Sequence, residues 1–432
     1  MMVNELEVMI SGNKAGVLRQ GADGSLSFQY LRDYRGVPLS SAIPLSTQIY
    51  KDKIIRPYLW GLLPEDPNTR KYVAAEAEVS YNNPFALLSV IGLDCPGAVQ
   101  FYVSDTQITH EEHLIPINEG DIVSRLARSR SNESSWIADN EHWSLGGQQN
   151  KFALRKNKNE WFICEGTAAT THILKSGVRE LAHQALNEYI CMRLAAECGI
   201  DTAQVEYVEF EGREGVEPAI VVERYDRLIT KQHVVRLHQE DLCQALGCLP
   251  DNKYAMYGGP TSIDVIQLLM STGSTAANNV ARFLQMFFFN YLVAATDAHA
   301  KNYSLMLDAS GNHHLAPMYD VASIAPYIER TQWNIKPPKL AMSIGGENRI
   351  GYLTANHLHK MVKQCGLERV GIVEEGCIKQ LVFYADIIPE KLSDIFDDLE
   401  ETQSALSAKE LMAYMEEPIV SLCKRAKERL LG

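Results

Sequence analysis

A short run of polar residues after a long apolar stretch contains the side chains needed for phosphoryl transfer. In Thr296-Asp297-Ala298-His299-Ala300-Lys301-Asn302, a carboxylate precedes an amide by five positions. The Asp297 carboxylate can orient a hydroxyl group and accept its proton. The Asn302 amide oxygen can ligate a metal ion without adding charge, and Asp320 adds a carboxylate ligand further along the chain. Because Mg²⁺ prefers few carboxylates together with phosphate oxygens and water, these residues suit a magnesium nucleotide.

Protein kinases use the same Asp-to-Asn spacing to place a catalytic carboxylate and a magnesium ligand on one loop. The apolar neighbours of Asp320 indicate burial, and a buried carboxylate needs a metal or another cation. The chain departs from protein kinases, since no His-Arg-Asp precedes Asp297 and Tyr-Asp-Val stands where Asp-Phe-Gly is usual. The run is closer to the Asp-x-His-x-x-Asn pattern of lipid-kinase-like enzymes. On its own, an aspartate after a helix is more often a cap or turn residue.

A glycine-rich segment, Ser144-Leu145-Gly146-Gly147-Gln148-Gln149-Asn150-Lys151, precedes a predicted strand. Paired glycines permit backbone conformations that present consecutive N–H groups to phosphate oxygens, and Lys151 adds a cation. The segment lacks the GxxxxGK[ST] pattern of a Walker A loop. The alternative interpretation is a simple Gly-Gly turn that opens a hairpin.

Two further segments could contact a nucleotide. Lys175 ends a predicted strand, which is the position of the kinase lysine that pairs with nucleotide phosphates, and Glu188 on the next helix could orient it. Glu223-Arg224-Tyr225-Asp226-Arg227 follows an apolar strand and could present backbone groups to an adenine edge. The alternative for all of these residues is a solvated charged surface.

The elements that must position these residues follow from hydrophobic periodicity. The N-terminal half predicts strands at 5–10, 25–28, 151–155, 161–164, 171–175 and 218–223, with one clear helix at 187–198 that Gly199 ends. Beyond about residue 240 the pattern predicts helices at 263–270, 280–296, 355–365 and 410–431, and a hairpin formed by 303–307 and 314–319. A β-rich part followed by a helical part predicts an α+β, two-lobed kinase-like fold.

A polar and charged segment at 106–140 is the predicted connection between units, with 128–135 as its least structured part. We therefore expect three domains: an N-terminal β-rich subdomain at 1–125, a kinase N-lobe with the phosphate loop at 126–245, and a mostly helical C-lobe with the catalytic loop at 246–432.

Composition limits the function. The 54 acidic and 41 basic residues give a formal net charge of −13, which argues against broad nucleic-acid binding by this chain itself. Nine cysteines occur without a CxxC pair, so neither a zinc site nor a disulfide framework is indicated. The acidic start and the odd cysteine count argue against secretion, and the apolar stretch at 283–295 falls short of the roughly 20 residues that span a bilayer. We expect a cytoplasmic protein that does not associate with membranes.

Taken in order, the motifs resemble the HipA family of serine/threonine kinase toxins of bacterial toxin–antitoxin modules. Besides the segments above, the resemblance rests on matches across nearly the whole chain, at residues 23–28, 38–41, 60–65, 172–175, 187–189, 222–227, 239–243, 296–302 and 317–320. The departures are mild: Gly146-Gly147-Gln148-Gln149 replaces a more usual Ala-Gly loop, and Tyr225 stands where Phe is common.

The resemblance implies roles for individual residues. Asp297 would be the catalytic aspartate, Asn302 and Asp320 would hold Mg²⁺, and Ser144 matches the serine that the family autophosphorylates, which would inactivate the toxin. The residues implied in ATP binding are Gly146, Gly147, Gln148, Gln149, Asn150, Lys151, Lys175, Glu223, Arg224, Tyr225, His299, Asn302, Tyr319 and Asp320.

The resemblance also implies partners. Family members phosphorylate an aminoacyl-tRNA synthetase, typically the glutamyl enzyme, which arrests growth and promotes persistence. They act as corepressors with a helix-turn-helix antitoxin dimer, HipB, which binds operator DNA, so that the complex is associated with the nucleoid. Two alternatives stand beside the kinase toxin: a catalytically inactive corepressor, which would be expected to lose at least one catalytic residue, and a small-molecule phosphotransferase, against which the N-terminal domain and Ser144 argue.

Overall fold

The computed structural model describes residues 4–103, 112–130, 143–147, 149, 151–178, 180–213, 215–231, 233–308, 310–329, 333 and 335–432. The chain forms two compact units, and each is described by itself. The first unit contains residues 1–180, 208–251 and 304–313, and the second contains residues 181–207, 252–303 and 314–432.

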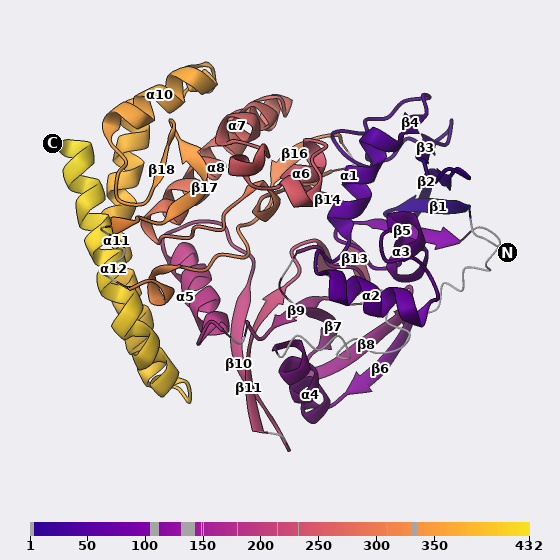
Figure 1. Ribbon diagram of the computed structural model, residues 1–432, viewed down its shortest axis with the longest axis horizontal. Coiled ribbons are helices and arrows are strands. Elements are labelled where there is room, and N and C mark those ends of the chain that lie inside the picture. Colours follow the sequence, from indigo (N-terminus) through magenta and orange to yellow (C-terminus); the bar gives the residue numbers. More distant parts are fainter. Residues whose placement is uncertain are drawn as a thin grey trace. The chain divides into compact units, whose positions relative to one another are not determined.

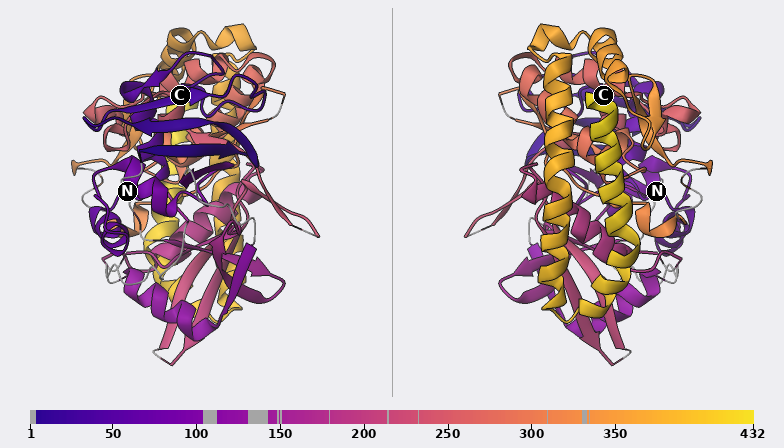
Figure 2. Two further views of the ribbon diagram at one scale, coloured as in Figure 1. Left: turned by 90° about the vertical axis from the view of Figure 1, so that its right-hand side faces the viewer. Right: turned by 90° about the vertical axis from the view of Figure 1, so that its left-hand side faces the viewer.

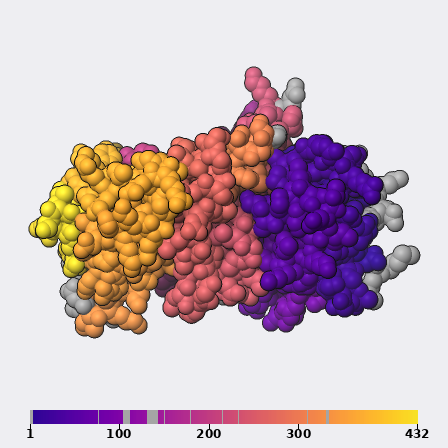
Figure 3. All heavy atoms as spheres, turned by 90° about the horizontal axis from the view of Figure 1, so that it is seen from above, coloured from indigo at the N-terminus to yellow at the C-terminus, as the bar shows by residue number. Residues whose placement is uncertain are grey.

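The first unit begins with a five-stranded sheet in the order β4-β3-β2-β1-β5. Its strands are β1 (Glu5–Ile10), β2 (Asn13–Gln20), β3 (Leu26–Tyr30), β4 (Tyr50–Lys51) and β5 (Val99–Val103). Strand β1 occupies the predicted residues, and every second side chain is buried, as expected of a sheet with one face on the core. Figure 3 shows this N-terminal region, in indigo, as a continuous surface.

Three helices accompany this sheet where the sequence pattern predicted only strands and loops. They are α1 (Asp52–Leu62), α2 (Pro67–Glu76) and α3 (Pro84–Ile91). The last two begin with a cap residue followed by proline: Asp66 accepts a hydrogen bond from the Thr69 N–H at 2.7 Å, and Asn83 accepts one from the Phe85 N–H at 3.1 Å. Their buried side chains join those of the sheet in one core.

A second sheet has six strands in the order β10-β11-β9-β7-β8-β6. Its strands are β6 (Glu112–Ile117), β7 (Phe152–Asn157), β8 (Glu160–Gly166), β9 (His172–Lys175), β10 (Val205–Gly212) and β11 (Gly215–Glu223). Helix α4 (Glu119–Arg130) packs on β11. The expectation of a connection at 106–140 is therefore wrong over 112–130, because β6 pairs with β8 and α4 buries an apolar face.

Shorter elements complete the first unit: β12 (Arg227–Ile229), β13 (Val234–Arg236), β14 (Gln239–Asp241), α6 (Leu242–Ala245), the 3-10 turn η2 (Pro250–Asn252) and β15 (Ser304–Leu307). Strand β12 pairs with β13, and β14 pairs antiparallel with β15. This last pairing brings the segment that follows the Asp297 run onto a strand from before residue 245.

The second unit is mostly helical. Its helices are α5 (Gln184–Glu197), α7 (Ser262–Met270), α8 (Ala276–Leu292), α10 (Ala355–Cys365), α11 (Glu374–Glu400) and α12 (Ala405–Leu431). Short elements connect them: η3 (Ala255–Tyr257), η4 (Gly273–Thr275), η5 (Ala300–Asn302), β16 (His313–Leu315), η6 (Ala325–Tyr327), β17 (Lys339–Ile344), β18 (Glu347–Arg349) and η7 (Leu367–Val370).

Helices α11 and α12 run side by side over their whole length (Figures 1 and 2), and an ion pair joins Lys427 to Asp386 between them. The β-rich N-terminal part and the helical C-terminal part confirm the predicted α+β class. None of the helices in the described part of the chain combines the length and apolar character that crossing a bilayer requires.

Candidate functional site

The Asp297 run begins where the buried helix α8 ends. Its last residue is Leu292, four positions before the predicted end, because Ala294 adopts a left-handed backbone conformation with φ of 54°. The Ala295 N–H then donates to the Asn290 carbonyl at 2.8 Å, which turns the chain back across the helix end. The buried aromatic side chains of α8 thus anchor the loop that carries the polar residues.

Three hydrogen bonds shape the loop around Asp297 and Asn302. The His299 N–H donates to the Asp297 carbonyl at 2.7 Å, and the Asn302 N–H donates to the His299 carbonyl at 2.9 Å. The Asn302 side-chain Nδ2 also donates to the Asp297 carbonyl, at 3.0 Å. Because the amide nitrogen makes this bond, the Asn302 Oδ1 is the atom of this side chain that could ligate a metal ion.

The segment that carries Asp320 is fixed at both ends. Before it, the Met318 N–H donates to the Asp201 carbonyl at 2.8 Å and the Tyr319 hydroxyl donates to the Lys301 carbonyl at 3.0 Å. After it, the Asn187 side chain on α5 donates to the Ser323 carbonyl at 2.7 Å and accepts from the Ser323 N–H at 3.1 Å. Asp320 itself has a left-handed φ of 60°. Such conformations cluster at functional sites, where surrounding contacts hold the strained residue.

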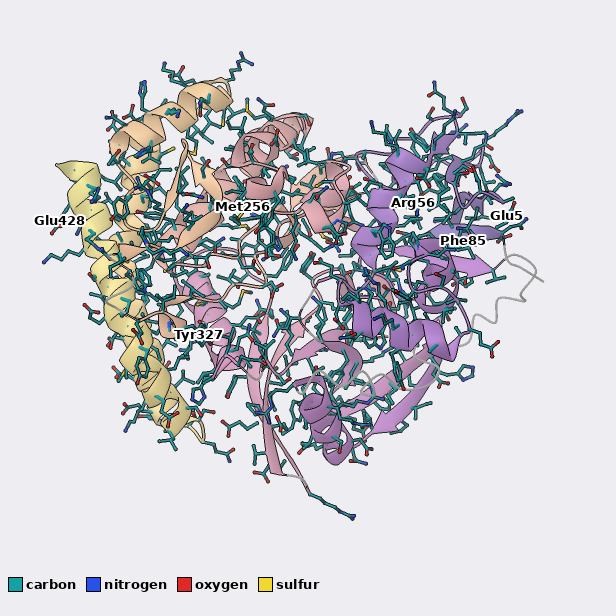
Figure 4. All side chains as sticks on the ribbon, viewed as in Figure 1. Glu5, Arg56, Phe85, Met256, Tyr327 and Glu428 are labelled. Atoms are coloured by element: carbon teal, nitrogen blue, oxygen red, sulfur yellow. The ribbon has the colours of Figure 1, made fainter. Side chains whose placement is uncertain are left out.

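The same asparagine, Asn187, donates to the Tyr327 hydroxyl at 3.3 Å, and that hydroxyl donates to the Ala182 carbonyl at 3.1 Å (Figure 4). These bonds tie α5 and Ala182, which precedes it, to the chain that follows Asp320. They give a structural role to Asn187, the first residue of the Asn-Glu-Tyr motif at 187–189.

Asp297, Asn302 and Asp320 line one cavity of the second unit. The residues that complete its wall are Asn290, Ala295, Ala298, Tyr303, Met318, Tyr319, Val321 and Ala322. The Asn290 Nδ2 donates to the Tyr303 hydroxyl at 2.9 Å, while its buried Oδ1 has no hydrogen-bond partner among the described residues. The oxygen donors of this cavity fit a small hard cation such as Mg²⁺.

The described residues include no group of three or more His, Cys, Asp or Glu side chains arranged to hold a metal ion. A site built from one carboxylate and one amide would rely on phosphate oxygens and water for its remaining ligands, which is the usual arrangement for Mg²⁺.

His299 lies buried in the same loop, and its Nδ1 has no hydrogen-bond partner among the described residues. Burial, together with the charges of Lys253 and Lys301, lowers the pKa of His299 to about 3, although the charge of Asp320 opposes the shift. The imidazole is therefore neutral at physiological pH, with a ring nitrogen available to a polar ligand.

The glycine-rich loop belongs to the first unit, where the chain after helix α1 holds it. The buried Ser144 hydroxyl donates to the Leu62 carbonyl at 2.7 Å, and the Glu65 N–H donates to the Gly147 carbonyl at 3.0 Å. Gly147 has a left-handed φ of 109°, and a side chain there would come within 2.8 Å of the Lys151 ammonium. Glycine is thus required both for the backbone and for the approach of Lys151. Gln149 is described, whereas Gln148 and Asn150 lie outside the described residues.

Lys175 ends β9 and is buried, paired in register with Ile220 of β11. Glu188, which the sequence suggested as its partner, is buried on α5 in the second unit. Glu223 ends β11, and the Tyr225 hydroxyl donates to Gln239 Oε1 at 2.8 Å.

The Arg224 side chain does not extend toward solvent. Its guanidinium is buried and donates to Asp94 Oδ2 at 3.2 Å and to both carboxylate oxygens of Asp226, while the Arg224 N–H donates to the Thr171 carbonyl. The interpretation of residues 223–227 as a solvated charged surface is therefore wrong for Arg224, which serves an internal ion cluster.

Three contacts of the predicted functional residues have no local signal in the sequence. The Tyr254 hydroxyl donates to Asp297 Oδ1 at 2.6 Å, across 43 positions of sequence. The contacts of Leu62 and Glu65 with the glycine-rich loop span more than 80 positions.

Comparisons with known proteins cover almost the whole chain. The HipA-like C-terminal domain family matches residues 143–404, and the HipA N-terminal domain family matches residues 6–102. The chain is 31% identical over 425 residues to the serine/threonine-protein kinase toxin HipA of Shewanella oneidensis, covering 93% of this chain and 90% of that protein. It is 35% identical over 378 residues to Y4mE of Sinorhizobium fredii, whose name gives kinase as an inferred activity, covering 85% of this chain and 87% of that protein.

A solved structure is similar throughout its length. It contains HipA, HipB and operator DNA of the Shewanella oneidensis toxin–antitoxin system, and it matches with a TM-score of 0.79 and 29% identity over 97% of each chain.

Proposed function

This chain belongs to the HipA family of serine/threonine-protein kinase toxins, and from that premise we propose that it is an ATP- and Mg²⁺-dependent kinase that acts on protein serine or threonine hydroxyls. One observation carries the proposal: Asp297, Asn302 and Asp320 line a single cavity. A chain that served only as a binding module would have no need of this set, nor of the left-handed backbone that Asp320 adopts.

The residues divide the chemistry among them. Asp297 orients the acceptor hydroxyl and takes its proton, while Asn302 and Asp320 hold Mg²⁺, which neutralises charge on the phosphate groups when it is bound. The residues from Gly146 to Lys151, together with Lys175, bind the ATP phosphates. The neutral His299 and Tyr319 lie beside the nucleotide, and the backbone of residues 223–225 meets the adenine.

Ser144 is the proposed site of autophosphorylation, which inactivates the toxin. Its hydroxyl is buried and donates to the Leu62 carbonyl. A phosphate there would place roughly −1.5 to −2 charges against that carbonyl oxygen. The segment would have to leave its position, and the loop could then no longer cradle ATP phosphates.

The proposed protein substrate is a component of translation, an aminoacyl-tRNA synthetase and specifically the glutamyl enzyme, whose phosphorylation stops growth and promotes persistence. The proposed partner is a HipB-like helix-turn-helix antitoxin dimer, with which the chain acts as a corepressor on operator DNA in the bacterial cytoplasm. The similar Shewanella HipA structure, which contains HipB and operator DNA, supports this partner. The net charge of −13 agrees with DNA contact mainly through the antitoxin.

The test is incubation of the purified protein with Mg-ATP, followed by intact mass measurement and peptide mapping. We expect the mass of one phosphate, located at Ser144, and no gain in the Asp297→Asn variant. A wild-type protein that binds ATP yet gains no phosphate after prolonged incubation would refute the kinase assignment.

Phosphoproteomics after a short pulse of expression, comparing wild type with Asp297→Asn, then identifies the protein substrate. Growth arrest should accompany the wild-type pulse unless the antitoxin is co-expressed, and unimpaired growth with the toxin alone would count against the toxin role.

A further inference from the structure

The Tyr254 hydroxyl is hydrogen bonded to Asp297, the carboxylate that is proposed to receive the proton of the acceptor hydroxyl. Tyr254 lies just before the 3-10 turn η3, and its hydroxyl donates to Asp297 Oδ1 at 2.6 Å. A hydroxyl hydrogen bonded to a carboxylate at this distance is a strong, charge-assisted contact. It is also the contact that a serine or threonine acceptor must make with a catalytic aspartate.

The Tyr254 ring is oriented by its neighbours. The His299 ring meets it edge-on, with centroids 5.0 Å apart at 80°. The ammonium of the buried Lys253 lies 5.5 Å from the ring centroid, which is within cation–π range. These contacts direct the hydroxyl toward Asp297 rather than into solvent.

The backbone beneath the ring is fixed, so only the side chain can move. The N–H groups of Tyr257 and Gly259 both donate to the Tyr254 carbonyl at 3.0 Å. A Cβ at Gly259 would come within 1.8 Å of the Asn252 carbonyl oxygen, so no residue larger than glycine fits at position 259. Met256, labelled in Figure 4, and Tyr257 are exposed on the same turn, which leaves solvent beside the ring for a rotated side chain.

We propose that the Tyr254 hydroxyl stands in for the acceptor hydroxyl on Asp297, and that the serine or threonine of the protein substrate must displace it. The inference rests on the proposed catalytic role of Asp297. In the transfer step, the acceptor oxygen bonds to the γ-phosphorus of ATP, the bond to the β–γ bridging oxygen breaks, ADP leaves, and the acceptor proton passes to Asp297. While Tyr254 holds Asp297 Oδ1, a water molecule cannot take that place.

Two consequences distinguish this role from simple support of the aspartate. Without the tyrosine hydroxyl, water gains access to Asp297, so ATP hydrolysis in the absence of a protein acceptor should increase. A protein acceptor no longer has to compete with the Tyr254 hydroxyl for Asp297, so the KM for the acceptor should fall while kcat stays nearly constant. A residue that merely positioned Asp297 would instead change kcat, because it would act on the chemical step.

The experiment compares Tyr254→Phe with Tyr257→Phe, both in a Ser144→Ala background so that self-modification does not consume the enzyme. Tyr257 is a matched control, since it is a tyrosine of the same turn, 67% exposed, with its ring edge-on to that of Tyr254. Phosphate release from Mg-ATP is measured without acceptor, and KM and kcat are measured with glutamyl-tRNA synthetase as the acceptor.

We expect Tyr254→Phe to raise phosphate release about tenfold and to lower KM by a similar factor, the effect of one lost competing hydrogen bond. Tyr257→Phe should match its parent. A Tyr254→Phe variant with reduced kcat and unchanged KM, or with no change at all, would overturn the inference, as would phosphate found on Tyr254 itself. A parent protein that binds ATP but neither hydrolyses nor transfers it would instead remove the proposed function, and this inference with it.

Discussion

Replacing Asp94 with asparagine should be among the most destabilising single changes in the first unit. Asp94 is 3% exposed and lies at the centre of a cluster of five charged side chains. Its Oδ1 accepts hydrogen bonds from Arg227 Nη2 at 2.9 Å and Arg236 Nε at 3.1 Å. Its Oδ2 accepts from the Thr170 hydroxyl at 2.6 Å and from Arg224 Nη1 at 3.2 Å.

The magnitude follows from the charges that remain. Three guanidinium groups face two carboxylates, those of Asp94 and Asp226. Removing one carboxylate therefore leaves three cations, two of them fully buried, around a single anion. Breaking a buried ion pair by removing one partner costs about 3–5 kcal/mol, because the remaining charges stay buried and unpaired. For a unit of this size, that corresponds to a fall of roughly 6–20 °C in the melting temperature.

The measurement is urea and thermal unfolding of the wild type, Asp94→Asn and a surface control, Glu5→Gln. Glu5 pairs with Arg19 at 2.8 Å in the same unit, but both side chains are more than a third exposed. Such a pair contributes about 0–1 kcal/mol, so the control should unfold close to the wild type. If Asp94→Asn costs no more than Glu5→Gln, water or relaxation compensates the arginines and the reasoning from burial is wrong.

Two further predictions concern single groups of the first unit. Phosphorylation of Ser144 should expose residues 143–147 to rapid amide hydrogen exchange, and unchanged protection after phosphorylation would contradict this. Ser144→Ala loses only the bond to the Leu62 carbonyl, so it should lower the free energy of unfolding by about 1 kcal/mol and leave these residues protected. Glu240 is buried against Ser40 and Ser41, and burial raises its pKa to about 7 from an ordinary value of 4.5. The folded protein therefore keeps a proton that the unfolded chain has lost, and stability should fall by about 3 kcal/mol as the pH rises from about 4.5 to 7. The difference in unfolding free energy between wild type and Glu240→Gln, measured at pH 5 and pH 8, isolates this effect, and a difference independent of pH would refute it.

The elements that hydrophobic periodicity predicted well are those whose buried faces repeat without interruption. Strand β1 and helix α10 occupy the predicted residues. Helix α11 was not predicted, although its buried positions recur at helical spacing over 27 residues. Pro389 lies inside it, and a proline normally ends a helix because it lacks the N–H and crowds the preceding turn. Packing against α12 outweighs that local cost here.

The grouping of three candidate site residues was more predictable than the contacts that support them. Asp297, Asn302 and Asp320 are close in sequence and of types that restrict their use, so spacing alone pointed to one site. The Asp94 cluster joins residues about 130 positions apart. In its own stretch of sequence, each member cannot be distinguished from an ordinary surface charge. Tyr254 likewise precedes Asp297 by 43 positions with no pattern between them. Contacts of this kind depend on how the helices and strands pack together, and hydrophobic periodicity gives no information about that packing.

The hydrogen bonds that fix the glycine-rich loop link two proposed properties, nucleotide binding and inactivation by phosphorylation of Ser144. The sequence alone does not connect them. The same short segment, 62–65, receives the Ser144 hydroxyl and donates to the Gly147 carbonyl. A phosphate on Ser144 must break the first contact, and because Gly147 is only three residues away, the second cannot persist unchanged. Nucleotide binding and its covalent loss would therefore depend on one set of hydrogen bonds. This gives the N-terminal part of the chain a direct role in the proposed reaction, since helix α1 carries the segment that holds the loop.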